Sequence, residues 1–215
     1  MHLSRCAAGV AALLIGGCGS TPSALLQGPP AASLLTIDQL VAPDFSLDVA
    51  AHAVTAAELV AADGVALQQL RSDGFRSAAA EDFFRNVGML NDINGPVQIH
   101  DTVEAFGSIA GAAALFADDV RQLDATTGAI ALSTGALGDR AHCTQRTADV
   151  AGVSAVEITV EWQVRNLVNV LVVRGRLGGT QLNDALLLAH TQTATEQSLT
   201  ASPFAGSTPA EAAAP

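Results

Sequence analysis

The chain of 215 residues carries 10 basic and 21 acidic residues, which gives a formal net charge of −11 at pH 7. A negative balance of this size opposes binding to nucleic acids and to anionic lipid headgroups, so a DNA- or RNA-binding role is not expected. With one tryptophan and no tyrosine, the chain also has few of the aromatic platforms that sugar-binding sites commonly use.

The N-terminus has the pattern of a secretory signal peptide. His2 and Arg5 precede an apolar run over residues 6–15, and two small residues separate this run from Cys18. The apolar run is shorter than the roughly 20 residues that a helix needs to span a bilayer. We therefore expect residues 1–17 to be removed as a signal peptide.

The residues Ile15-Gly16-Gly17-Cys18 resemble the lipobox of bacterial lipoproteins. The resemblance implies that Cys18 is alkylated with diacylglycerol, that the chain is cleaved just before it, and that the new amino terminus is often acylated. Two or more acyl chains hold a protein stably on a membrane. The implied protein is anchored through this lipid to the cell membrane or outer membrane and faces the extracytoplasmic side. The alternative is an ordinary signal peptide in which Cys18 has no such role.

Composition divides the mature chain into three parts. Residues 18–32 hold the lipidated cysteine and an uncharged segment rich in Gly, Ser, Pro and Ala, which predicts a flexible tether. Residues 33–197 have the size of one domain, and residues 198–215, rich in Ala, Ser and Pro, predict a disordered tail. With Cys18 lipidated, Cys143 has no disulfide partner in the mature chain, and we expect a small buried residue rather than a reactive thiol.

The first predicted element is a helix over residues 56–71. Thr55 and Glu58 fit a capping box, in which each side chain satisfies a backbone amide at the start of the helix. Gly74 can end the helix, because glycine readily adopts the left-handed conformation that commonly follows a last turn.

A hairpin is predicted next, from a segment over residues 75–91 and a strand over residues 97–105. Asn94-Gly95 joins them and suits a tight turn, since both residues tolerate positive φ angles. Residues 91–95 also place oxygen-bearing side chains at alternate positions before a glycine, as a calcium loop does, but Leu90 would occupy the first ligand position. The hairpin interpretation is therefore favoured.

Residues 108–123 predict an amphipathic helix, because apolar residues such as Ile109, Ala112 and Phe116 recur at helical spacings. The clearest strand covers residues 156–165, where apolar and polar residues alternate. This alternation predicts one face in the core, including Trp162, and one face in water.

The turn that follows this strand determines which residues face each other. A three-residue turn, Arg165-Asn166-Leu167, would pair Trp162 with Val170, whereas a two-residue turn would pair Trp162 with Asn169. The longer turn is favoured, because it places apolar residues of the two strands opposite each other. With a last helix over residues 180–196, the expected fold is a single α+β domain, an antiparallel sheet with helices packed on one face.

Candidate sites are few. His100, Asp101 and Glu104 carry metal-ligand side chains, but on a strand His100 and Asp101 point to opposite faces, so no metal site is expected. The polar strand face with Glu157, Glu161 and Arg165 can bind a partner, but a solvated face with cross-strand charge pairs is the favoured interpretation. The motifs of known nucleophiles, phosphate loops and dinucleotide sites are missing. We therefore assign no catalytic residue and no cofactor.

A second resemblance covers residues 137–197. Leu137-Gly138-Asp139, the Trp162 strand, Arg165-Asn166-Leu167-Val168 and the last helix together resemble a module of secreted and lipid-anchored bacterial proteins whose function is unassigned. The resemblance implies an extracytoplasmic α+β domain and implies no catalytic residue.

The leading functional hypothesis is a non-catalytic module, held at the cell envelope by lipid on Cys18, that binds an envelope protein or an apolar small molecule. The alternative is an envelope hydrolase whose active site is assembled from dispersed residues. A carrier with a cavity between sheet and helices is a third possibility.

The substitution Cys18→Ala removes the only thiol that the lipobox interpretation allows to be lipidated. We expect the variant to lose its lipid mass and to leave the membrane fraction, because one sulfur carries the diacylglycerol. Mass spectrometry and membrane fractionation of both proteins measure this. A wild type without lipid mass, together with a variant that still partitions with membranes, would contradict the anchor.

Overall fold

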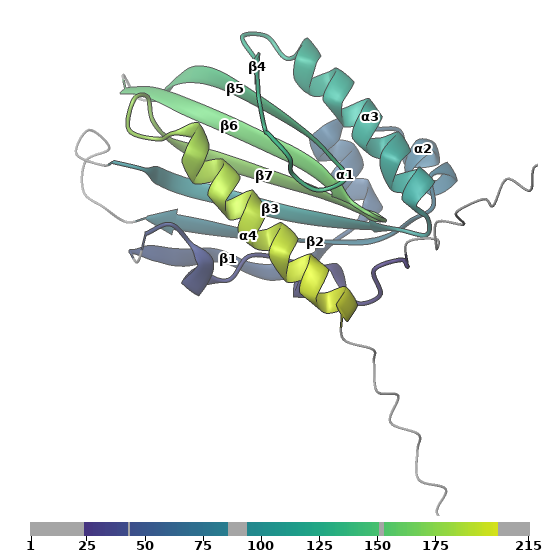
Figure 1. The fold of residues 1–215 in the computed structure, drawn as a ribbon. Helices are drawn as coiled ribbons and strands as arrows, with labels where there is room; N and C mark the ends of the chain where they lie inside the picture. Colours follow the sequence, from purple (N-terminus) through teal and green to yellow (C-terminus); the bar gives the residue numbers. More distant parts are fainter. Residues whose placement is uncertain (1–23, 43, 86–93, 151–152, 202–215) are drawn as a thin grey trace, which may run out of the picture.

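The computed structural model describes residues 24–42, 44–85, 94–150 and 153–201. They form a single α+β domain around one seven-stranded antiparallel sheet of order β1-β2-β3-β7-β6-β5-β4 (Figure 1). The strands are β1 (Phe45–Val54), β2 (Phe75–Arg85), β3 (Pro96–Phe106), β4 (Ile130–Leu132), β5 (Arg140–Val150), β6 (Val153–Val164) and β7 (Leu167–Arg176). The helices are α1 (Ala56–Asp63), α2 (Leu67–Ser72), α3 (Ile109–Ala125) and α4 (Leu182–Ala201), with the short 3₁₀ helices η1 (Pro30–Ala32) and η2 (Ile37–Gln39). The predicted α+β class and antiparallel sheet are confirmed.

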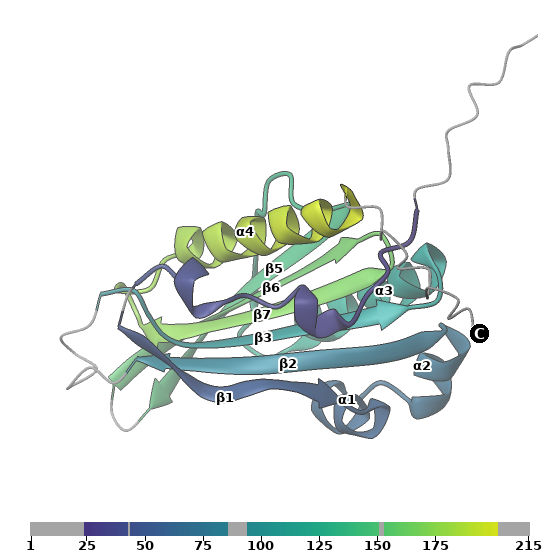
Figure 2. The same cartoon turned by 90° about the horizontal axis from the view of Figure 1, so that it is seen from below.

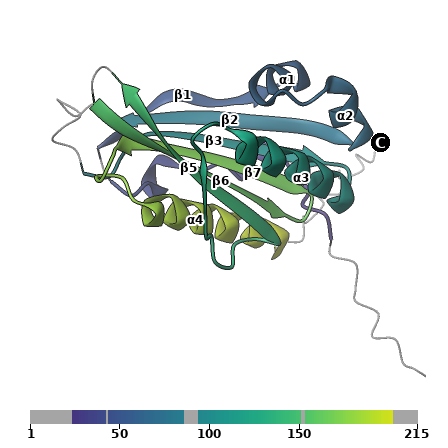
Figure 3. The ribbon, with the colours of Figure 1, turned by 90° about the horizontal axis from the view of Figure 1, so that it is seen from above.

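The helices lie on both faces of the sheet, which corrects the prediction that they pack on one face. Helix α4 covers one face together with η1 and η2, and we call this side the α4 face (Figure 2). Helices α1, α2 and α3 lie on the opposite side, the α3 face (Figure 3). The polar residues of β6 do not all meet water as expected, because Glu161 and Gln163 are 1% and 0% exposed beneath α3.

Each face has its own apolar core. On the α4 face, Trp162 and Val160 of β6 pack with Ala185 and Leu188 of α4. On the α3 face, Leu115 of α3 belongs to a second cluster, which continues beneath α1 and α2. Burying one large apolar side chain contributes about 1.5–3 kcal/mol, so both layers stabilise the sheet. The expectation that Trp162 is a core residue is confirmed.

Local signals placed the helix starts correctly. Thr55 caps α1, where its hydroxyl oxygen accepts a bond from the Glu58 amide at 3.3 Å and the Glu58 carboxylate accepts one from the Thr55 amide at 2.7 Å. The predicted helix over 56–71 is divided into α1 and α2, because Gly64 adopts a left-handed φ of 72° and ends the first part. Helix α3 is confirmed, with Ser108 as its cap.

The predicted hairpin of β2 and β3 is confirmed as an antiparallel pair, with Phe84 opposite Gln98. The prediction of a tight turn at Asn94-Gly95 is wrong. Strand β2 ends at Arg85 and strand β3 begins at Pro96, so the connection between them is longer. Residues 91–93 of the considered calcium loop lie outside the described residues.

The turn between β6 and β7 has two residues rather than three. Trp162 lies opposite Asn169, and Val164 lies opposite Leu167. Arg165 takes a positive φ of 56°, and two-residue turns of this kind match the twist of paired strands. The prediction failed because it treated Asn169 as a misfit, whereas Asn169 is fully buried and donates to the Glu196 carboxylate at 3.4 Å.

Part of the segment predicted as a flexible tether is packed against the domain. The Leu26 amide donates to Asn166 Oδ1 at 2.6 Å, and the guanidinium of Arg165 donates to the Ala24 carbonyl at 3.1 Å. Pro30 is buried. None of the helices in the described ranges combines the length and apolarity that a membrane span requires.

A layer of buried acids lies between α4 and the sheet. The Asp101 carboxylate accepts hydrogen bonds from the Leu35 amide at 2.8 Å and from Gln192 Nε2 at 3.0 Å. Burial raises the pKa of Glu196 to about 9, and the nearby Asp101 adds to the rise. Burial also raises the pKa of Asp101 to about 7, against the effect of its two hydrogen bonds. The folded protein therefore holds protons that the unfolded chain releases.

This proton retention predicts that stability falls as the pH rises. Above a pH of about 4.5 the unfolded chain ionises these carboxyls while the folded state keeps them neutral, so the free energy of unfolding drops by at most about 1.4 kcal/mol per pH unit for each group. Glu196→Gln removes one titrating group and should be more stable than the wild type at alkaline pH, with a shallower pH dependence. Urea unfolding at several pH values measures both effects.

Asp48→Asn, at an exposed position of β1, is the matched control and should leave the slope unchanged. A stability that rises with pH in the wild type would show that the carboxyls under α4 are ionised in the folded state.

Candidate functional site: a groove between α1 and α3

An open hollow of about 340 Å³ lies on the α3 face above β3 and β7. Helix α1 and strand β1, labelled in Figure 3, both contribute lining residues. Its volume falls at the lower end of the range of small-ligand sites. The hollow is lined by His52, Val54, Glu58, Leu59, Ala80, His100, Thr102, Glu104, Val170 and Val172.

A second hollow, of about 210 Å³, adjoins the first at Val170 and continues beside α3. Its other lining residues are Asp119, Gln122, Leu123, Thr126, Thr159 and Glu161. The two hollows share a floor, so we treat them together as one feature, the groove. Asp119 of α3 faces this groove.

Strand register determines which side chains form the floor. In an antiparallel sheet, residues directly opposite each other point to the same face. One row across the strands therefore brings Ala80, Thr102, Val170 and Glu161 together. The neighbouring row brings together Asp82, His100, Val172 and Thr159. Valines occupy the middle of both rows, and polar side chains flank them.

Three residues of these rows form a hydrogen-bonded chain. The distance from His100 Nδ1 to Asp82 Oδ1 is 2.7 Å, and that from His100 Nε2 to Thr102 Oγ1 is 3.0 Å. Because a carboxylate only accepts, Nδ1 carries the proton, and Nε2 of the neutral ring then accepts from the threonine hydroxyl. The side chain of His100 is 38% exposed, so a ligand in the groove can reach the ring.

The lining is acidic and partly apolar. It contains the carboxylates of Glu58, Glu104, Asp119 and Glu161 but no arginine. Hydrogen bonds from the backbone and hydroxyl of Thr55 lower the pKa of Glu58, which favours its charged form. The groove thus offers hydrogen-bonding groups and negative charge around a valine floor.

The three residues weighed as metal ligands are divided between the faces, as predicted. His100 and Glu104 line the groove, whereas Asp101 is bound under α4 by Leu35 and Gln192. The described part of the chain holds no cluster of three or more metal-ligating side chains.

Two other sequence predictions concern cysteines. Cys143 is buried and unpaired, which confirms the expected environment. Burial raises the pKa of its thiol to about 11, so the reactive thiolate is disfavoured. Cys18, the predicted lipidation site, lies outside the described residues.

The Leu137-Gly138-Asp139 motif holds the β6–β7 turn rather than a ligand. Asp139 Oδ2 accepts from the Arg165 amide at 2.6 Å, and the Asp139 amide donates to the Gln163 carbonyl at 2.8 Å. Gly138 has a φ of 57°, and a Cβ there would lie 2.4 Å from the Gln163 carbonyl oxygen. The glycine is therefore required by a close backbone approach.

Sequence reasoning missed Asp82, Thr102 and Thr159 as groove residues. A signal was present for one pair, because His100 and Thr102 stand two positions apart on a strand and must share a face. Asp82 joins them only through the pairing of β2 with β3, which no local pattern encodes.

Comparison with known proteins gives limited similarity. No protein-family model matches the chain, and no curated protein matches it in sequence. Among solved structures, it is similar to the extracellular domain of PknH from Mycobacterium tuberculosis, with a TM-score of 0.43 and 9% sequence identity. That match covers 74% of this chain and 82% of the PknH domain.

Proposed function

We propose that the protein is a non-catalytic binding module, held on the extracytoplasmic side of a membrane by lipid on Cys18, and that the groove holds its ligand. The sequence supports the location through its signal peptide and lipobox patterns. The groove above β3 and β7 carries the binding proposal.

The polar floor of the groove is the supporting observation. Thr102, Thr159 and Glu161 are 6%, 8% and 1% exposed, on a sheet face whose other end is an ordinary apolar core. Thr102 bonds to His100, and these polar side chains lie beside an open hollow and not in a sealed core. Such groups, placed around valines, are typical of sites that orient a small ligand.

The ligand that fits this lining has an apolar part and hydrogen-bonding groups. Val170 and Val172 offer apolar contacts, and the hydroxyl oxygens of the flanking threonines and the carboxylate of Glu58 can accept hydrogen bonds. An amphipathic small molecule or a short segment of an envelope protein has this chemistry.

The backbone around the floor favours binding over catalysis. Strand β3 is paired with β2 on one side and with β7 on the other, so the amides near Thr102 are used in the sheet. Acyl transfer needs preorganised donors for the developing oxyanion, most often free backbone amides. A binding site has no such requirement.

Filling the groove tests the proposal. Val172→Trp places a large ring on the floor, and we expect it to abolish ligand retention. The full chain carrying Cys18→Ala is incubated with an extract of envelope lipids and metabolites, and native mass spectrometry records the bound non-protein mass. Leu187→Trp is the matched control, because Leu187 is 59% exposed on α4, away from the groove.

The control should keep the bound mass. Equal retention by the Val172→Trp and Leu187→Trp proteins would place the ligand elsewhere, and no bound mass in any protein would contradict a small-molecule ligand.

The chain Asp82–His100–Thr102 favours a second candidate function, an envelope hydrolase. In this role Thr102 Oγ1 attacks an acyl carbonyl while His100 Nε2 takes its proton, and Asp82 stabilises the imidazolium. The proton then passes to the leaving alcohol, and water releases the acyl group from Thr102.

A fluorophosphonate probe separates the two candidates. If the protein is a hydrolase, the probe labels Thr102, and His100→Gln reduces labelling at least about 100-fold, as loss of a general base does. Thr159→Ala is the control, because Thr159 lines the groove but is not part of the chain Asp82–His100–Thr102. We expect no labelling of the wild type, as a binding module requires.

A further inference from the structure

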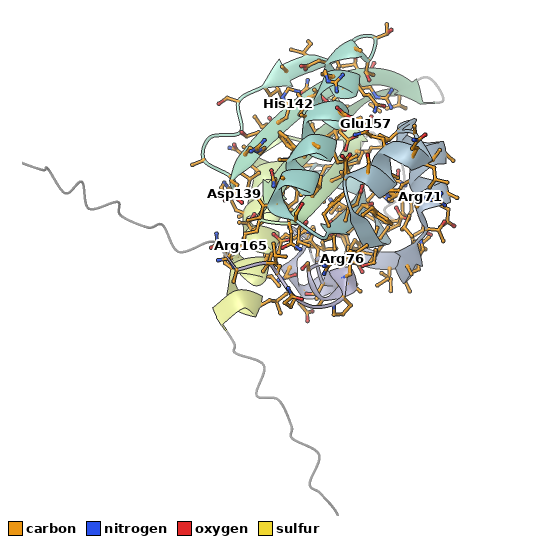
Figure 4. The ribbon with its side chains drawn as sticks, turned by 90° about the vertical axis from the view of Figure 1, so that its right-hand side faces the viewer. Arg71, Arg76, Asp139, His142, Glu157 and Arg165 are labelled. Carbon is orange, nitrogen blue, oxygen red and sulfur yellow. The ribbon has the colours of Figure 1, made fainter. Side chains whose placement is uncertain are left out.

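The arginines of this acidic chain are unevenly placed. One end of the sheet is formed by the start of β2, the β6–β7 turn and the start of β5, and we call it the tether end because Arg165 there binds the Ala24 carbonyl. Arg71, Arg76, Arg140 and Arg165 lie at this end, three of them labelled in Figure 4. Arg71, Arg76 and Arg140 are exposed, and Arg165 is half-buried.

Four arginines elsewhere in the described part of the chain form ion pairs with carboxylates. Arg85 pairs with Asp44 at 2.8 Å, and Arg121 pairs with Asp118. Arg146 and Arg174 share Glu157, at 2.5 Å and 2.6 Å.

The tether-end arginines differ in this respect. Among the residues that the structure describes, none of the four forms an ion pair with a carboxylate; Arg140 stacks on the Phe116 ring at 5.9 Å instead. Asp73 and Asp139 lie at the same end, but the Asp73 carboxylate is bound by Gln69 and the Asp139 carboxylate by the Arg165 amide. Four guanidinium groups therefore outnumber these two carboxylates.

The tether end is also the part of the domain nearest to the expected lipid. Five residues lie between Cys18 and Ala24, and an extended chain spans at most about 3.6 Å per residue. Lipid on Cys18 would thus keep this end within roughly 20 Å of the membrane, because each residue adds so little reach.

We propose that the tether end docks on the headgroups of anionic phospholipids in the anchoring membrane, through Arg71, Arg76, Arg140 and Arg165. The net charge of the chain does not prevent this contact, because salt screens charges beyond about 8 Å and the acidic groove lies along the sheet. Docking in this orientation holds the groove to the side of the bilayer, open to ligands. That lipid on Cys18 brings the tether end to the membrane rests on the proposed function.

Vesicle binding by the full chain carrying Cys18→Ala tests the arginines without the lipid. Vesicles of phosphatidylcholine alone are compared with vesicles that also contain phosphatidylglycerol, and sedimentation measures the bound protein. We expect binding only to the anionic vesicles, weakening with salt. Each arginine near such a surface strengthens binding about fivefold, so Arg71→Gln with Arg76→Gln should weaken it at least about tenfold.

The matched control is Arg121→Gln with Arg146→Gln, which changes the net charge equally but away from the tether end. It should bind like the parent. An equal loss in both double variants, or equal binding of the parent to both kinds of vesicle, overturns the docking proposal. Thermal unfolding of each variant checks that the fold is intact.

The anchor is judged separately, by the lipid mass on Cys18 in the wild type. Absence of that mass contradicts lipid anchoring. The vesicle result still decides whether the tether-end arginines bind anionic headgroups. Lipid on Cys18 without any preference for anionic vesicles supports the anchor and overturns docking.

Discussion

The β6–β7 turn holds together segments that lie far apart in the sequence. Asn166 in the turn donates through Nδ2 to the Phe106 carbonyl at 3.0 Å and to the Leu26 carbonyl at 3.3 Å, while its Oδ1 accepts from the Leu26 amide. Asp139 binds the Arg165 amide beside it. The end of β3, the start of β5 and the N-terminal segment are therefore held at one point, and the strand register is held with them.

That register determines the chemistry of both faces. Shifting a strand by one residue would exchange the side chains of its two faces. With Trp162 opposite Asn169, Asn169 faces α4 and meets Glu196, while Val170 faces the groove. The buried acids and the valine floor follow from the same pairing, so the proton-binding layer and the candidate ligand site are two results of one constraint.

Acidic and basic side chains lie in different parts of the molecule, which the net charge does not show. Carboxylates gather around the groove, and the four guanidinium groups that have no carboxylate partner among the described residues lie at the tether end. The total charge argues against contact with an anionic membrane, and the local charge argues for it at one end. Since screening limits each charge to its neighbourhood, the local arrangement decides the orientation that we propose.

Local physics determined what the sequence could predict. Local patterns predicted the capping box at Thr55, the amphipathic helix α3 and the alternation in β6, and the lack of a disulfide partner predicted that Cys143 is buried. The α+β class followed from these elements. The signal peptide and lipobox patterns at Cys18 are likewise local, and they remain predictions because that segment lies outside the described residues.

The tertiary structure decided the features that depend on pairing between distant strands. Each of these features depends on segments far apart in the chain. They are the two-residue turn instead of three, the helices on both faces, the contact of Asp82 with His100, and the placement of Arg71, Arg76 and Arg165 at one end. Apolar matching misjudged the register because a buried Asn169 that donates to Glu196 costs less than one without a partner, and this partner cannot be found until the fold brings α4 over the sheet.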